Sequence, residues 1–406
     1  MQIEGSKVGI IGGSIAGCAA AIALTRLGCD VTVLERSEGA LQDRGMGIVI
    51  PPHLLAELVE HAYLSADYAC VHQLARRTYV HDGSYYGALK WDFAWQGMAN
   101  NWGSLWRGLR ANLDPAVAYR SGARVQDVVE DDDRVVVVLG DGEALSFDVV
   151  VGADGYRSML RRRLHPQTEP DFADYVLWRG SFSGSRLEHD DGWEEVVDDH
   201  AAILVGFDGG HGVAYAIPEL DPDTVDELRI NWAIYTPTPA GLRAEEPSSI
   251  PPGAVTDEWF AELDAVRAEC FPPRLRALFT SPRAETTIQP IYDCVVDSYV
   301  GERVLLLGDA ATVARPHAGV GATKALEDAR LLETLGAAYG TWEGLLAAYD
   351  QDRTPNGKEL VEISRRMGHA LVDNTPPWSQ MTPDDYEAWM ISQITGDTWE
   401  LAGTEA

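Results

Sequence analysis

The stretch Val8-Gly9-Ile10-Ile11-Gly12-Gly13-Ser14-Ile15-Ala16-Gly17 decides the fold of the first part of the chain. An apolar strand runs into a glycine-rich turn, and the turn opens a helix. A second apolar strand, 30–34, follows. This strand–helix–strand order is typical of a dinucleotide-binding unit. Gly12 permits the tight turn and Gly17 lets the helix pack close to the strand, so the unpaired N–H groups at the helix start face a pyrophosphate.

Two residues refine this prediction. Ser14 stands where the pattern has its middle glycine, and its small side chain still allows the backbone to approach a phosphate. Glu35 ends the second strand, where a carboxylate can accept both ribose hydroxyls and would repel a 2′-phosphate. The unit therefore predicts an adenine dinucleotide with free ribose hydroxyls, either FAD or NAD.

Length and composition indicate an ordinary globular protein. The 406 residues, 46% of them apolar, suggest two domains. Apolar runs are too short for a membrane helix, and the start of the chain leads directly into the first strand, so we expect a cytoplasmic protein. The five cysteines are widely spaced without a Cys-x-x-Cys pair, which argues against a disulfide framework or a metal site.

The formal net charge of −31 argues against nucleic acid or an anionic membrane as a partner, since both attract clustered cations. An acidic body also does not steer polyanions. From this we expect a neutral or cationic substrate, with the anionic cofactor held by local arginines and helix termini.

Later stretches predict more of a ligand site. In 43–51, Gly45 and Gly47 flank Met46 beside Arg44, a pattern that suits either backbone close to a flat ligand or a plain turn. The segment 148–161, with Asp154 and Gly155, again places a buried strand before a small-residue turn and a helix. The segment 302–311 is a third strand, ending in Gly308-Asp309, and the glycine-rich segment 315–322 opens another helix.

The remaining elements are expected as follows. Helices are predicted over 52–63, 103–113, 257–271 and 341–371, the last interrupted near Pro355; paired strands over 71–93; an antiparallel meander over 124–129, 134–139 and 144–147; and a separate sheet over 175–182, 201–207, 212–217 and 228–235. Thr382-Pro383 predicts the start of a last helix, in an arm that packs on the body or on another subunit; a homodimer stays open.

The three strand–turn motifs, Gly12 to Gly17 with Glu35-Arg36, 152–158 and 308–311, resemble the three fingerprints of class A FAD-dependent aromatic monooxygenases, the para-hydroxybenzoate hydroxylase family. The resemblance covers about residues 5 to 370. Smaller stretches, 45–49, 175–180 and 315–318, are similar to the dihydroxypyridine hydroxylase branch. The resemblance implies an α/β fold with a Rossmann-like FAD-binding domain, an inserted antiparallel-sheet substrate domain and a C-terminal helical region.

The same resemblance implies domain bounds and cofactor contacts. The discontinuous FAD-binding domain would comprise 1–75, 100–165 and 295–372, the substrate domain 76–99 and 166–294, and the C-terminal arm 373–406. The residues implied to bind FAD are Gly12, Ser14, Ile15, Ala16, Gly17, Glu35, Arg36, Arg44, Gly45, Met46, Gly47, Arg107, Val125, Asp154, Gly155, Gly308, Asp309, Pro316, Gly319, Val320, Gly321 and Ala322.

The activity that the resemblance implies is hydroxylation of a small aromatic or N-heteroaromatic substrate by NAD(P)H and O2 through a flavin C4a-hydroperoxide. Candidates for a catalytic base are His317, Tyr215, His211 and His53. Two alternatives stay open. The same flavin adduct could serve epoxidation, Baeyer–Villiger oxidation or oxidative decarboxylation, or the chain could be a flavin-binding regulatory module without turnover.

Overall fold

The segment Lys7–Ile11, apolar after its first residue, forms β1, the central strand of a five-stranded parallel sheet. The computed structural model describes residues 1–39, 46–131, 133–187, 192–219, 227–243, 249–397 and 399. The strands of this sheet lie in the order β16–β10–β1–β2–β6, and the other four are β2 (Asp30–Glu35), β6 (Ala118–Ser121), β10 (Val149–Gly152) and β16 (Val304–Leu306). The three strands that precede the predicted motifs, β1, β10 and β16, are therefore neighbours, and their turns meet at one edge of the sheet.

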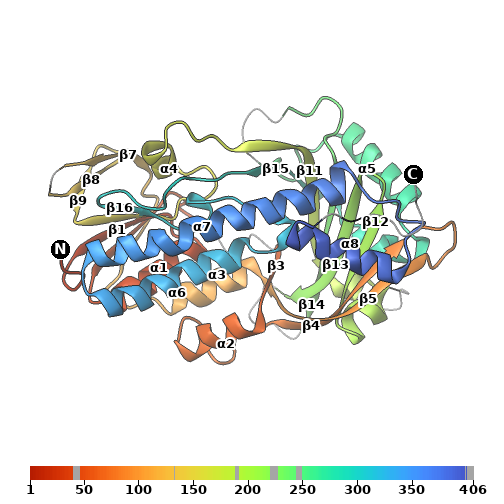
Figure 1. The fold of residues 1–406 in the computed structure, drawn as a ribbon, viewed down its shortest axis with the longest axis horizontal. Helices are drawn as coiled ribbons and strands as arrows, with labels where there is room; N and C mark the ends of the chain where they lie inside the picture. The colour runs from red at the N-terminus through yellow and green to blue at the C-terminus, as the bar shows by residue number, and fades with distance from the viewer. Residues whose placement is uncertain are drawn as a thin grey trace.

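Helices cover one face of this sheet and a small sheet covers the other (Figure 1). The helices are α1 (Ile15–Arg26), α3 (Trp102–Ala111), α6 (Gly321–Tyr339) and α7 (Trp342–Gly368). The small sheet is the predicted meander, built from β7 (Val125–Glu130), β8 (Val135–Leu139) and β9 (Ala144–Phe147). Phe147 packs directly against Gly9 of β1, where any larger residue would collide with its ring.

An eight-stranded sheet forms the other half of the molecule (Figure 1). In spatial order its strands are β15 (Thr287–Asp293), β11 (Asp171–Ser183), β14 (Leu228–Pro237), β13 (Gly210–Pro218), β12 (Ala201–Phe207), β4 (Val71–Val80), β5 (Ala88–Asn101) and β3 (Gly47–Ile50). All pairs are antiparallel except β12 with β4. The fold predicted from the sequence is confirmed, whereas the exact domain bounds stay a prediction.

The two faces of the eight-stranded sheet differ in chemistry. The outer face carries Trp178, Trp232 and Ile234, which pack with Phe271 and Phe279 near α5 (Asp257–Cys270) into an apolar core. Because side chains alternate along a strand, their neighbours point to the inner face. That face holds His211, Tyr215, Tyr235 and Asn231 among other polar residues, and it faces the first half of the molecule.

The C-terminal segment covers part of this inner face. After the single turn His369–Asp373, the chain continues to α8 (Pro383–Thr395), which begins with a capping box between Thr382 and Asp385. Trp378, Tyr386 and Trp389 are buried, and Trp378 lies against Gly206 of β12. The described part of the arm therefore packs on the body of its own chain, as one of the two predicted arrangements has it.

The predicted interruption of the long helix near Pro355 is wrong, because α7 is continuous. A proline inside a helix costs about 3 kcal/mol. Here Leu345 and Tyr349 before it and Val361 after it are all fully buried. Packing on both sides of the proline holds the helix together.

The remaining helices are α2 (Pro52–Glu60) and α4 (Met159–Leu164). Among the described residues, no helix combines the length and the apolar character needed to cross a membrane.

Candidate active site

The first glycine turn is built to hold a phosphate. Gly12 has a φ of +102°, and a Cβ at Gly17 would lie 1.8 Å from the carbonyl oxygen of Gly12. Ser14 is the N-cap residue of α1, yet its side chain caps no backbone group. The N–H groups of Ile15 and Ala16 in the first helical turn are therefore left to a ligand, as a phosphate site requires.

Glu35 lies beside this turn and is only 7% exposed. Its two carboxylate oxygens accept hydrogen bonds from the backbone N–H groups of Gly13 and Ser37, each at 2.8 Å. A cavity of about 540 Å³ adjoins the ends of β2 and β6; it is lined by 120–124 and 139–141. Half-buried Val125 follows this lining directly, and Arg36 is exposed nearby.

The second and third motifs each present a half-buried aspartate. Asp154 accepts a hydrogen bond from the N–H of Met159 at 2.7 Å through one oxygen, while its other oxygen is buried without a partner among the described residues. Asp309 carries no hydrogen bond on its carboxylate within the same described ranges. Burial raises the pKa of both side chains. Carboxylates left in this state suit the hydroxyl groups of a polyol such as the ribityl chain of FAD.

Sequence reasoning missed the residue that ties these motifs together. Arg161 is 1% exposed and donates to the carbonyl oxygens of Asp309 at 2.9 Å, Ala310 at 3.2 Å and Tyr156. A single guanidinium thereby fixes the turn at Gly155 against the turn at Gly308. The signal was an arginine six residues after Gly155, but arginines also follow it at 162 and 163.

A second missed group supports Gly308 from α6. Lys324 donates to the carbonyl oxygen of Gly308 at 2.7 Å, and buried Asp328 accepts from the N–H of Gly308 at 2.9 Å. Arg353 of α7 donates to the other oxygen of Asp328 at 3.3 Å. Both backbone groups of the glycine that precedes Asp309 are therefore held.

The segment Pro316 to Ala322 provides another uncapped helix start. Gly319 has a φ of +68°, Val320 is the N-cap residue of α6, and its side chain caps no backbone group. The N–H groups around Gly321 and Ala322 are thus available to a ligand that carries negative charge. Pro316 begins the short turn that carries His317 towards the eight-stranded sheet.

Two of the predicted catalytic residues lie in one aromatic group, here called the His–Tyr cluster: Tyr175, His211, Tyr235 and His317. His211 stacks on Tyr235 with ring centroids 4.4 Å apart, and His317 lies 4.4 Å from Tyr235 and 5.1 Å from His211. Burial lowers the pKa of His211 to about 4. The pKa of His317 lies well below its usual value because His317 is buried and because His211 and Arg315 are nearby. Both imidazoles are therefore neutral at physiological pH.

Hydrogen bonds give these two imidazoles different roles. His211 donates to the carbonyl of Leu371, and its Nδ1 has no partner among the described residues, so Nδ1 keeps its lone pair. The Tyr175 hydroxyl lies 2.6 Å from Nε2 of His317. Tyr175 is fully buried and also contacts the Arg315 guanidinium, which can only donate, so its own proton goes to His317. His317 then carries its proton on Nδ1.

The third candidate, Tyr215, lies where β3 meets the inner face. A Cβ on Gly47 would lie 2.8 Å from the Tyr215 hydroxyl, and the N–H of Gly47 donates to Asn231 at 2.8 Å. The carbonyl oxygen of Met46 accepts from the N–H of Trp102 at 2.8 Å. Arg44 and Gly45, predicted beside them, lie outside the described residues.

Two further predicted residues have other contacts. His53 is exposed at the start of α2, where it acts electrostatically on Glu327. Arg107 on α3 donates to Ser104 at 3.0 Å. The structure therefore brings His211, His317 and Tyr215 to one face and leaves His53 apart; the role of each stays a prediction.

The polar residues present fit FAD. Uncapped helix starts stand at both ends of the site. Between them, along the parallel strands, lie the Asp154 oxygen and the Asp309 carboxylate, which have no hydrogen-bond partner among the described residues. Such a series matches a long dinucleotide with phosphates, hydroxyl groups and a ring that takes negative charge.

Comparison with known proteins supports this assignment. A family model described as FAD binding domain matches residues 266–364, and one described as pyridine nucleotide-disulphide oxidoreductase matches residues 7–54. The chain is 28% identical to 2,6-dihydroxypyridine 3-monooxygenase of Paenarthrobacter nicotinovorans, over 90% of this chain and 91% of that protein. It is 27% identical to salicylate hydroxylase of Pseudomonas putida, over 90% and 86% of the two chains.

Solved structures show the same fold. The structure of 2,6-dihydroxypyridine-3-hydroxylase from Arthrobacter nicotinovorans superposes with a TM-score of 0.80, at 25% identity, over 99% of this chain and 98% of that one. Klebsiella pneumoniae HpxO complexed with FAD and uric acid gives a TM-score of 0.74 at 24% identity, over 96% and 97% of the two chains. With the three motifs at one sheet edge and a site that fits FAD, the chain is similar in sequence and fold to the class A FAD-dependent monooxygenases.

Proposed function

We propose that this protein uses FAD, NAD(P)H and O2 to hydroxylate a small aromatic or N-heteroaromatic compound. One observation carries the proposal: the inner face of the eight-stranded sheet presents His211 and Tyr215 to the side where His317 and Gly47 lie. A sheet face that served only as a core would be apolar, as the part of the outer face around Trp178, Trp232 and Ile234 is. The activities of both named relatives, on a dihydroxypyridine and on salicylate, support the substrate class.

FAD, when bound and reduced, supplies the electrons and the activation of O2 for this reaction. The chain's own part is to bind, orient and exclude water. The N–H groups near Gly321 would stabilise negative charge on the flavin ring. The buried rings of Tyr175, Tyr235 and His211 keep water from one side of the site.

The hydrogen bonds of the two histidines suggest separate tasks. Nδ1 of His211 has a free lone pair and could accept a proton or a hydrogen bond from a substrate hydroxyl, although its pKa of about 4 makes it a weak base. His317, with its proton on Nδ1, would act as a hydrogen-bond donor. Tyr215, whose pKa burial raises to about 12, would stay protonated and bind rather than remove a proton.

The test is substrate-stimulated oxidation of NADH and NADPH by the flavin-loaded protein, with hydroxylated pyridines, phenols, benzoates and indoles. We expect one class to accelerate the oxidation and to gain one oxygen atom by mass, with little peroxide released. Tyr215→Phe should impair coupled hydroxylation, whereas Tyr339→Phe, at an exposed position on α6, should not.

Other outcomes would redirect or refute the proposal. An oxygen inserted by ring expansion, or an epoxide, would favour the alternative oxidations. A yellow protein that no compound stimulates would refute turnover and favour a flavin-binding regulatory module.

A further inference from the structure

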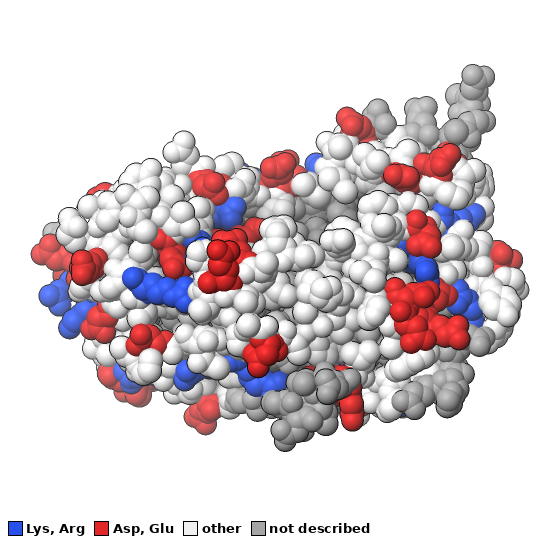
Figure 2. Space-filling view, turned by 90° about the horizontal axis from the view of Figure 1, so that it is seen from below, with Lys and Arg blue, Asp and Glu red and all other residues white. Residues whose placement is uncertain are grey.

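Lys324 is the one buried lysine among the four of this chain. The other three, Lys7, Lys90 and Lys358, are exposed or half-buried. On the face seen in Figure 2, acidic and basic side chains lie together in small groups at the surface, where water solvates them. Lys324 lacks this solvation, because its side chain is only 4% exposed. Its charge must therefore be stabilised by the protein or by a ligand.

Helix stability does not explain the position of this lysine. Lys324 lies in the first turn of α6, where the helix dipole disfavours a cation. Its ion-pair partner on the same helix, Asp328, comes four residues later at 3.3 Å, and an acidic residue before a basic one would be the more favourable order. The arrangement instead places a positive charge at the helix start whose N–H groups are available to a ligand.

The contacts of Lys324 lead to the turn that carries Asp309. Its Nζ donates to the carbonyl oxygen of Gly308 at 2.7 Å. Gly308 is wedged between two helices, because a Cβ on it would lie 3.2 Å from the Cβ atoms of both Ala16 and Ala325. Ala16 belongs to the first turn of α1, the expected pyrophosphate site. The ammonium group, Asp309 and the pyrophosphate site therefore lie around a single glycine.

Bound FAD would bring like charges together at this place. Its pyrophosphate adds two negative charges near the Asp309 carboxyl group, and negative charges disfavour ionisation of a neighbouring carboxyl group. Burial already raises the pKa of Asp309; the cations Lys324 and Arg161 lower it, and the Asp328 carboxylate raises it. Of the two cations, Lys324 has the larger effect on Asp309. It is thus the main counter-charge that the chain supplies to this carboxyl group.

We propose that Lys324 is a positioning residue for FAD: its ammonium group keeps the Asp309 carboxylate ionised beside the pyrophosphate, so that Asp309 accepts hydrogen bonds from the ribityl hydroxyl groups. Lys324 also fixes the carbonyl group of the preceding glycine, which holds the turn that carries this carboxylate. Without the charge at 324, Asp309 would take up a proton at a higher pH than in wild type, and a protonated carboxyl group accepts fewer hydrogen bonds.

The experiment measures how tightly the flavin-loaded protein retains FAD at pH 6.5 and at pH 9. The loaded protein is diluted stepwise, and the FAD that dissociates is measured by its fluorescence. Lys324→Met removes the charge and the hydrogen bonds but nearly keeps the length of the side chain. We expect it to weaken FAD binding relative to wild type by about 30-fold at pH 6.5. At pH 9, where Asp309 is ionised again, the loss should be less than about fivefold.

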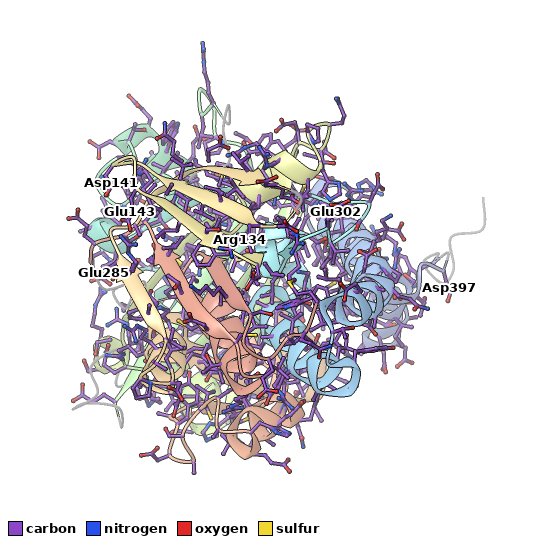
Figure 3. All side chains as sticks on the ribbon, turned by 90° about the vertical axis from the view of Figure 1, so that its left-hand side faces the viewer. Arg134, Asp141, Glu143, Glu285, Glu302 and Asp397 are labelled. Atoms are coloured by element: carbon purple, nitrogen blue, oxygen red, sulfur yellow. The ribbon has the colours of Figure 1, made fainter. Side chains whose placement is uncertain are left out.

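Two other substitutions separate charge from shape. Lys324→Gln keeps a donor for the Gly308 carbonyl oxygen but carries no charge, so it should show the same recovery at pH 9 even if Lys324→Met folds poorly. Lys324→Arg keeps the charge, so any loss should be equal at both pH values. As controls, Lys358→Met removes a half-exposed ammonium group beside Asp297, and Arg134→Gln removes a charge at an exposed position near the three-stranded sheet (Figure 3). Neither control should change the retention of FAD.

Asp309→Asn identifies the group that titrates. In that background, Lys324→Met should weaken FAD binding by the same factor at both pH values. A pH dependence that persists there would come from Asp328 and would overturn the proposal. Equal losses at both pH values for Lys324→Met and Lys324→Gln in the otherwise wild-type chain would also overturn it, because a purely structural lysine gives that result. Since NAD(P)H and substrate are absent, the outcome is independent of the proposed hydroxylation.

Discussion

His211 makes the stability of this protein depend on pH in a way that one substitution can isolate. Its imidazole is 5% exposed, stacks on Tyr235 and has a pKa near 4, against an ordinary value of 6.5. In the unfolded chain the ring gains a proton as the pH falls below 6.5, whereas in the folded protein it stays neutral until about pH 4. Folding is therefore not affected by this group above pH 6.5 and is increasingly opposed below it.

The size of the effect follows from the shift. Relative to neutral pH, the shifted pKa of His211 lowers the free energy of unfolding by about 2 kcal/mol at pH 5 and by about 3 kcal/mol near pH 4. His211→Gln removes this cost together with the hydrogen bond to Leu371 and the stacking on Tyr235. At pH 7.5 the variant should be less stable than wild type by about 1 to 3 kcal/mol. At pH 5 that gap should shrink by about 2 kcal/mol.

Urea unfolding of both proteins at pH 7.5 and pH 5, followed by tryptophan fluorescence, measures the gap. Subtracting the two proteins at each pH removes the contribution of the carboxylates they share. His72→Gln, at an exposed position on β4, is the control and should give the same gap at both pH values. A gap for His211→Gln that is the same at both pH values would refute the assignment of a neutral, buried imidazole.

Three further substitutions test the site. Gly17→Ala places a Cβ 1.8 Å from the Gly12 carbonyl oxygen, so α1 must move; we expect a loss of about 3 kcal/mol in thermal unfolding and little flavin in the purified protein. Arg161→Gln leaves buried carbonyl oxygens without a donor and should cost about 3 kcal/mol and weaken flavin retention; unchanged flavin content would contradict its linking role. Tyr175→Phe should move the proton of His317 from Nδ1 to Nε2, which nitrogen-15 spectra of labelled histidine detect; an unchanged tautomer would contradict the direction of the hydrogen bond.

The cofactor half of the site could be predicted because its signals are local. Gly12 is required by its own φ of +102° and Gly17 by its approach to the Gly12 carbonyl oxygen, and each of the three strand–turn motifs is complete within about fifteen residues of sequence. Parallel strands then bring the three turns to one edge wherever β1, β10 and β16 are neighbours. The carboxylates of Asp154 and Asp309 follow from their places in these motifs.

The substrate side could be predicted only as separate residues. His211, Tyr215 and His317 were candidates, but their approach depends on how β13 and β14 pair and on where the turn at Pro316 packs. Nothing in the sequence near His53 shows that it stays outside this group. Long-range strand pairing, and not the local sequence pattern, decides which of the candidate residues come together.

Arg76 and Arg77 show most clearly what the sequence alone cannot predict. Two adjacent arginines look equivalent in the sequence, but in a strand their side chains point to opposite faces of the sheet. Arg77 meets three carboxylates, two of them on the segment 194–199, and Arg76 meets an aromatic ring. Only the register of β4 against β12 decides which arginine faces the site. A shift of one residue would exchange their roles.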